Sequence, residues 1–238
     1  MTIEDKKKNV LDVFNTTAEK YVEYFGDDWE FKNEIDGFIH SVVSNGKVLD
    51  LGCGSGYISK YITDNNLQSI RIDFSEKMIE IANKKYPQIP FYKMDIANVD
   101  GFFEENTFDG LLAIYTLYFI PKEQMDRVLE SLSKILKNGA PFFMVTQIGK
   151  GEIFVDESLM PESSQKKALF VNLNTQEELL ELLQKHNFNV DQLQFYPNID
   201  PDEIPGDGRL VIQATNQKTK IKNRWYKVLM LDIIFFYF

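Results

Sequence analysis

Cysteine and histidine are scarce in this chain of 238 residues. Cys53 is the only cysteine, so no disulfide can form within the chain, which suits the reducing cytoplasm that we expect as its location. The only two histidines, His40 and His186, lie far apart in the sequence. We therefore expect neither a zinc site nor a Cys–His catalytic pair, and we predict no metal.

Long apolar runs and positive charge are also in short supply. No stretch reaches the roughly 20 apolar residues of a membrane-spanning helix, and the N-terminus lacks the apolar core of a signal peptide. The chain has 26 lysines and arginines against 36 acids, which gives a formal net charge of -10. Because affinity for phosphate backbones comes largely from Lys and Arg, we expect a small-molecule partner rather than nucleic acid. The sequence does not indicate an oligomeric state.

The most informative stretch is V-L-D-L-G-C-G-S-G-Y, residues 48–57. It is typical of a short buried strand, a glycine loop and the start of a helix, and a ligand can lie against the backbone of such a loop. The glycines Gly52, Gly54 and Gly56 differ in spacing from the G-x-G-x-x-G of dinucleotide sites. Asp50, just before them, suits an ammonium group better than a pyrophosphate. The pattern therefore favours a nucleoside with a cationic amino-acid arm over a nicotinamide cofactor, the other explanation being a plain glycine-rich turn.

Two further acids follow the glycine loop at the ends of predicted strands. Asp73 ends the strand predicted over 69–73, where nucleotide-binding α/β folds place an acid that accepts both ribose hydroxyls. Asp95 ends a short strand predicted over 89–95. Because parallel strands end at one edge of a sheet, we expect Asp50, Asp73 and Asp95 at the ligand edge. Each acid taken alone is also explained as a helix cap or a solvated turn carboxylate.

The glycine loop, the segment D-F-S-E-K-M at 73–78 and the third acid together resemble the class I S-adenosylmethionine-dependent methyltransferases. The resemblance covers about residues 10–216 and implies an α/β fold. Its Rossmann-like sheet would have seven mostly parallel strands in the order 3-2-1-4-5-7-6, with the last strand antiparallel and helices on both faces. It divides the chain into an N-terminal helical cap (1–45), a methyltransferase core (46–216) and a basic and apolar tail (217–238) outside the family pattern. We expect the tail to be a non-functional extension, with a membrane-surface or subunit contact as the alternatives.

The resemblance also implies the cofactor and its contacts. The cofactor would be S-adenosyl-L-methionine, with S-adenosyl-L-homocysteine as the product. Asp50 would face the methionine end, Asp73 the ribose, and Asp95 the exocyclic amine of adenine, beside the Ile96 amide. The other implied cofactor contacts are Tyr21, Gly52, Cys53, Gly54, Gly56, Phe74, Met78 and Ile114. Tyr21 is equally explained as a core aromatic, and Arg71 stands where the family often has glycine.

The acceptor side is less well defined. Tyr115 and Tyr118 follow the predicted fourth strand, where the family often places a polar or aromatic residue facing the transferred methyl group. They are the candidate catalytic residues, as substrate contacts, although core packing explains them equally well. A loop over 154–167 is a candidate cover for the substrate. The expected function is methyl transfer by in-line displacement to a small-molecule acceptor; the alternative is a non-catalytic cofactor-binding protein that acts through a partner.

Overall fold

The computed structural model describes residues 1–26, 29–155, 168–198 and 205–218. Most of the expected loop over 154–167 and nearly all of the expected tail lie outside these ranges. Within them, no helix combines the length and apolar character that crossing a membrane requires.

The centre of the molecule is a seven-stranded sheet in the order β3-β2-β1-β4-β5-β9-β8. Its strands are β1 (Lys47–Leu51), β2 (Gln68–Asp73), β3 (Tyr92–Lys93), β4 (Gly110–Ile114), β5 (Pro141–Ile148), β8 (Phe188–Pro197) and β9 (Gly208–Asn216). The strands from β1 to β5 in this sheet pair in parallel, whereas β9 is antiparallel to both β5 and β8. Numbered within the sheet, this is the predicted order 3-2-1-4-5-7-6, and the predicted fold class is confirmed.

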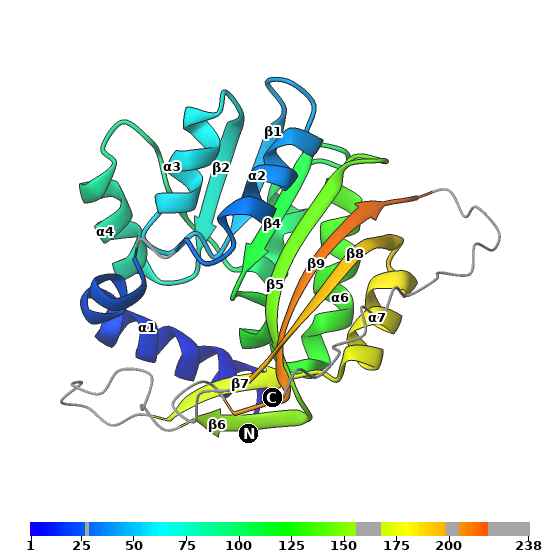
Figure 1. Ribbon diagram of the computed structural model, residues 1–238. Coiled ribbons are helices and arrows are strands. Elements are labelled where there is room, and N and C mark those ends of the chain that lie inside the picture. Colours follow the sequence, from blue (N-terminus) through cyan, green and yellow to red (C-terminus); the bar gives the residue numbers. More distant parts are fainter. Residues whose placement is uncertain (27–28, 156–167, 199–204, 219–238) are drawn as a thin grey trace, which may run out of the picture.

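Helices cover both faces of the sheet (Figure 1). They are α2 (Lys32–Ser41), α3 (Tyr57–Asp64), α4 (Glu76–Lys85), the short α5 (Val99–Phe102), α6 (Lys122–Ile135) and α7 (Gln176–Lys185), with single 3-10 turns η1 (Ile96–Asn98) and η2 (Leu117–Phe119). Neighbouring residues on a strand enter different cores: Leu111 packs with α6 and α7, and Leu112 packs with α2 and α3. This alternation is what a strand buried on both faces requires.

A separate antiparallel hairpin lies outside the main sheet. It consists of β6 (Gly151–Val155) and β7 (Leu169–Leu173). The expected loop over 154–167 begins too early, because residues 154 and 155 are the last two of β6. The physical reason is pairing: every residue of β7 is buried, and its backbone pairs with β6 along the whole strand.

The first helix, α1 (Ile3–Phe25), crosses the edge of the sheet where the central strands end (Figure 1). Thr2 and Asp5 form a capping box at its start. Val10, Val13 and Tyr21 pack in one cluster with the hairpin. The helix therefore forms one wall of the space above the strand ends.

Candidate functional site

A glycine loop joins β1 to α3 at the carboxyl edge of the sheet. Gly52 and Gly54 have φ angles of 66° and 50°, which glycine adopts without steric cost. A methyl group at Gly52 would overlap the side chain of Thr116, whereas at Gly54 it would meet open space. The loop is therefore packed from behind at Gly52 and open at Gly54, where a ligand can lie against the backbone.

Two adjoining clefts run along this loop. The first has a volume of about 820 Å³, part of it open to solvent, and holds Asp73 and Asp95. The second has a volume of about 750 Å³ and holds Asp50 and Cys53. Both clefts are lined by Tyr21, Gly52, Gly54, Ile114 and Tyr115. Because they share these walls, one elongated ligand can occupy both.

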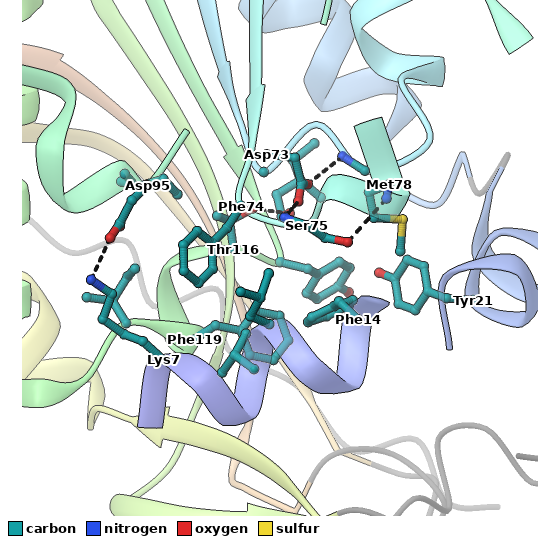
Figure 2. A pocket seen from close by; sticks show the side chains of 18 of the residues that line it. Lys7, Phe14, Tyr21, Asp73, Phe74, Ser75, Met78, Asp95, Thr116 and Phe119 are labelled. Carbon is teal, nitrogen blue, oxygen red and sulfur yellow. Dashed lines mark hydrogen bonds and ion pairs between the residues drawn. The ribbon is translucent and has the colours of Figure 1, made fainter. Parts of the chain in front are cut away.

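Backbone amides fix Asp73 at the end of β2. One carboxylate oxygen accepts a hydrogen bond from the Gly54 amide at 3.0 Å, and the other accepts one from the Ser75 amide at 2.8 Å. Burial raises the pKa of Asp73, and these two hydrogen bonds oppose the rise. Figure 2 shows the carboxylate between the glycine loop and the start of α4. Its orientation is set before any ligand arrives.

Asp95 lies farther along the first cleft, just before η1. Its Oδ1 accepts a hydrogen bond from the Ala97 amide at 2.9 Å, and its Oδ2 lies 2.5 Å from Nζ of Lys7 on α1. Phe74, Met78 and Ile96 line the same cleft. This end of the cleft therefore combines apolar walls with one oriented carboxylate, a combination that suits an aromatic base.

Asp50 is a buried carboxylate on the wall of the second cleft. It is 3% exposed and accepts a hydrogen bond from the Ser59 hydroxyl of α3. Burial raises its pKa to about 6, although the Ser59 hydrogen bond and the nearby positive charge of Arg71 oppose the rise. Arg71 is the direct neighbour of Asp50 across β1 and β2. A cationic ligand group in the second cleft would face this carboxylate.

Tyr115 and Tyr118 take different positions after β4. Tyr115 has a φ angle of 51°, lines both clefts and donates its hydroxyl to Oε2 of Glu30 at 3.1 Å. Tyr118 is buried against Phe119, with ring centroids 4.3 Å apart, and lines neither cleft. Burial raises the pKa of both hydroxyls above the usual value, so both stay protonated near neutral pH. Tyr115 can contact a ligand, and neither residue suits the role of a general base.

The structure brings nearly all of the predicted cofactor contacts to the clefts. Tyr21, Asp50, Gly52, Cys53, Gly54, Asp73, Phe74, Met78, Asp95, Ile96 and Ile114 each line at least one of them. Gly56 lines neither, because it sits at the start of α3 against the Phe91 ring. Lining a cleft does not test a contact with the cofactor, so these roles stay predictions.

Several lining residues were not predicted from the sequence. Lys7 and Phe14 reach the first cleft from α1, and Thr116, Phe119 and Gln124 reach it from the segment after β4 (Figure 2 labels all but Gln124). The sequence identified Tyr115 and Tyr118 in that segment. It did not predict which of the neighbouring side chains face the cleft, because the chain there forms a single 3-10 turn without a strand or helix period. Within the described ranges, no cluster of three or more His, Cys, Asp or Glu is placed to hold a metal.

Residues 48–139 match a family model described as a methyltransferase domain. A stretch of 147 residues is 28% identical to putative methyltransferase 235L of Invertebrate iridescent virus 6; it is 60% of this chain but only 52% of the virus protein, so the chain spans about half of that relative. A longer stretch of 194 residues is 27% identical to malonyl-[acyl-carrier protein] O-methyltransferase 1 of Ilyobacter polytropus, covering 80% of this chain and 70% of that protein. Among solved structures, the 1,6-didemethyltoxoflavin-N1-methyltransferase of Burkholderia thailandensis, with bound 1,6-didemethyltoxoflavin and S-adenosylhomocysteine, superposes with a TM-score of 0.69 at 16% identity over 91% of each chain.

Proposed function

We propose that this chain is a class I S-adenosylmethionine-dependent methyltransferase and that it transfers a methyl group from this cofactor to a small-molecule acceptor bound beside Tyr115. The observation that carries the proposal is the row of three carboxylates along two joined clefts. Asp50, Asp73 and Asp95 lie at or near the ends of successive parallel strands, and the glycine loop runs between them.

Each carboxylate has a matching group on the cofactor. Asp73 would accept hydrogen bonds from the two ribose hydroxyls, since a carboxylate offers two acceptor oxygens to two adjacent donors. Asp95 would accept one from the exocyclic amine of adenine, and Asp50 would face the ammonium of the methionine arm. The open space at Gly54 lets the cofactor pass along the loop between the two clefts. The structure thus offers a partner for the nucleoside and for the charged arm.

The chain's contribution to the reaction is alignment and exclusion of water. The bound cofactor supplies a methyl group that its sulfonium already activates. Phe14, Phe119 and Ile120 make the first cleft apolar, and Tyr115 offers a hydroxyl and an aromatic ring at the junction of the two clefts. Burial raises the pKa of Tyr115 and Tyr118, which disfavours either hydroxyl as a general base. We therefore propose an acceptor atom that is nucleophilic without deprotonation by these residues.

The charges around the clefts favour an acceptor without phosphate or carboxylate groups. Among the described residues that line the two clefts, Lys7 is the one cation, and it is paired with Asp95. Arg209, near Tyr115, pairs with Glu30 at 2.9 Å. An anionic acceptor would therefore meet mainly carboxylates. We propose neutral acceptors, such as nitrogen heterocycles, or acceptors that carry a cationic group away from the reacting atom.

The proposed division of the chain follows the same logic. Residues 1–45 supply α1, which covers the first cleft, and residues 46–216 supply the sheet and its loops. The described lining residues of both clefts all precede residue 125. Removal of the tail, residues 217–238, is therefore expected to leave cofactor affinity unchanged.

The direct test is turnover on a panel of acceptors. Purified protein is incubated with S-adenosylmethionine and with sets of neutral, cationic and anionic small molecules, and S-adenosylhomocysteine is measured. We expect multiple turnovers with members of the neutral or cationic sets. Cofactor binding without turnover on any set would favour the alternative, a non-catalytic cofactor-binding protein. Turnover confined to the anionic set would refute the proposed acceptor class.

A further inference from the structure

Lys7 of α1 is a mostly buried cation in the wall of the first cleft, the cleft proposed to hold the nucleoside. It lines the cleft, and its side chain is only 16% exposed. Its Nζ lies 2.5 Å from Oδ2 of Asp95 and 5.9 Å from the centre of the Phe74 ring. Figure 2 shows Lys7 reaching up from α1 to the carboxylate on the far side of the cleft. Lys7 of α1 thus forms an ion pair with Asp95, the residue proposed to accept a hydrogen bond from the adenine amine.

The ion pair leaves Asp95 able to accept another hydrogen bond. Its Oδ1 accepts the Ala97 amide and its Oδ2 contacts Lys7, so each oxygen has one partner. A carboxylate has about four acceptor sites in all. Lys7 therefore need not leave when a base binds. With Ala97 on the opposite oxygen, it fixes the rotation of the carboxylate.

Lys6, the preceding residue of α1, makes a separate set of ion pairs. Nζ of Lys6 lies 2.9 Å from Glu123 of α6 and 2.5 Å from Glu152 of β6. The Lys6 side chain is 7% exposed, and this anchor touches no proposed cofactor contact. The two lysines thus pair with different parts of the molecule, and of the two only Lys7 pairs with a residue that lines the first cleft.

We infer that Lys7 is a positioning residue for the cofactor's base: its ion pair orients Asp95 to accept a hydrogen bond from a 6-aminopurine, and ties α1 to the occupied cleft. This inference rests on the proposed function, since it takes Asp95 as the adenine contact. It explains why a lysine is buried at the mouth of a cleft rich in acids. It also makes the preference for an amino over an oxo group at purine C6 depend on a residue outside the glycine loop.

The chain offers a matched control for the test. Lys8 is the next residue of α1 and is exposed, so Lys8→Met makes the same change of charge and volume away from the cleft. Lys7→Arg keeps the charge and the reach to Asp95. Calorimetry would measure binding of S-adenosylhomocysteine, and of S-inosylhomocysteine with an oxo group in place of the amine, to the wild type and these variants. Thermal melts would confirm that each variant is folded.

We expect Lys7→Met to bind S-adenosylhomocysteine about tenfold more weakly and to lose most of the preference over the inosyl analogue, because hydrogen bonds to charged groups are the strong ones. Lys7→Arg should keep most of the preference, and Lys8→Met should match the wild type. Unchanged or tighter binding by Lys7→Met, or an equal loss in Lys8→Met, would overturn the role of Lys7 while leaving the proposed function intact. A wild type that binds neither compound would refute the proposed function and the inference with it.

Discussion

The protonation of Asp50 should make the affinity for the cofactor depend on pH. Burial raises its pKa to about 6, and the groups that face it are Ser59 of α3, Arg71 and Asp73 of β2, and Cys53 of the loop. Above pH 6 the carboxylate is charged and attracts the ammonium group of the cofactor. As the pH falls through 6 it takes up a proton and loses that attraction. The sign is therefore fixed: acid weakens binding.

We expect the affinity for S-adenosylmethionine to fall toward a limit of about tenfold per pH unit below the pKa, as a single linked proton requires. Calorimetry across this range, in the wild type and in Asp50→Asn, measures it. The variant should bind weakly with little dependence on pH. Asp64→Asn, which changes an exposed carboxylate of α3, should retain the wild-type profile. A flat wild-type profile would refute the role of Asp50.

The glycine loop gives a second prediction at the scale of single residues. Alanine at Gly52 or Gly54 must adopt a positive φ angle, which costs about 1–2 kcal/mol of stability. At Gly52 the added methyl also overlaps Thr116, which donates to the Leu51 carbonyl at 2.9 Å, whereas at Gly54 it meets open space. Gly52→Ala should therefore lose more stability, and Gly54→Ala should stay folded while binding cofactor more weakly.

Urea denaturation and calorimetry on the two variants separate these effects. Gly54→Ala that binds cofactor as tightly as the wild type would show that the cofactor does not lie against the loop. Equal losses of stability in both variants would show that Thr116 does not pack behind Gly52 as described.

At the scale of elements, the docking of α1 decides how closed the first cleft is. The helix is held by apolar contacts to the hairpin and by the ion pairs of Lys6 with Glu123 and Glu152. Lys6→Met would leave two carboxylates without their shared cation. Because Glu123 is 53% exposed and solvent screens it, we expect a loss of only about 1–2 kcal/mol in unfolding free energy.

Hydrogen exchange of α1 measures the same change locally. Lys6→Met should speed exchange over the first turns of α1 with or without cofactor, and Lys8→Met should not. Slow exchange in Lys6→Met would show that the apolar contacts alone hold the helix. This pattern differs from that of Lys7, whose loss should show mainly in binding.

The elements also show how far the sequence could predict the site. Asp73 and Asp95 were predictable because each follows a short strand, and parallel strands place their ends at one edge. Lys7 was not, because its contact depends on how α1 lies against a loop nearly ninety residues away. Tyr118, for which the sequence left substrate contact and core packing equally open, is buried and lines neither cleft. The chain passes through η2 there, so neither the strand nor the helix period predicts its direction.

At the scale of the whole molecule, the fold brings segments that are far apart in the sequence together around the first cleft. The parallel strands bring Asp73, Asp95 and the glycine loop to one edge, α1 closes that edge, and the segment after β4 completes the wall. The strand order was expected from the family resemblance, because the spacing of the strands along the chain does not by itself give their order in the sheet. Strand β6 was missed because it is short and pairs only with β7, outside the main sheet.

The central claim is that this edge binds S-adenosylmethionine through Asp73, and calorimetry tests it most directly. We expect the wild type to bind S-adenosylmethionine and S-adenosylhomocysteine, and Asp73→Ala to bind both about 10–100-fold more weakly, as loss of hydrogen bonds to a charged group predicts. Asp64→Ala should bind as the wild type does, and melts should show both variants folded. Wild-type protein that binds neither compound, or Asp73→Ala that binds as tightly as the wild type, would contradict this account.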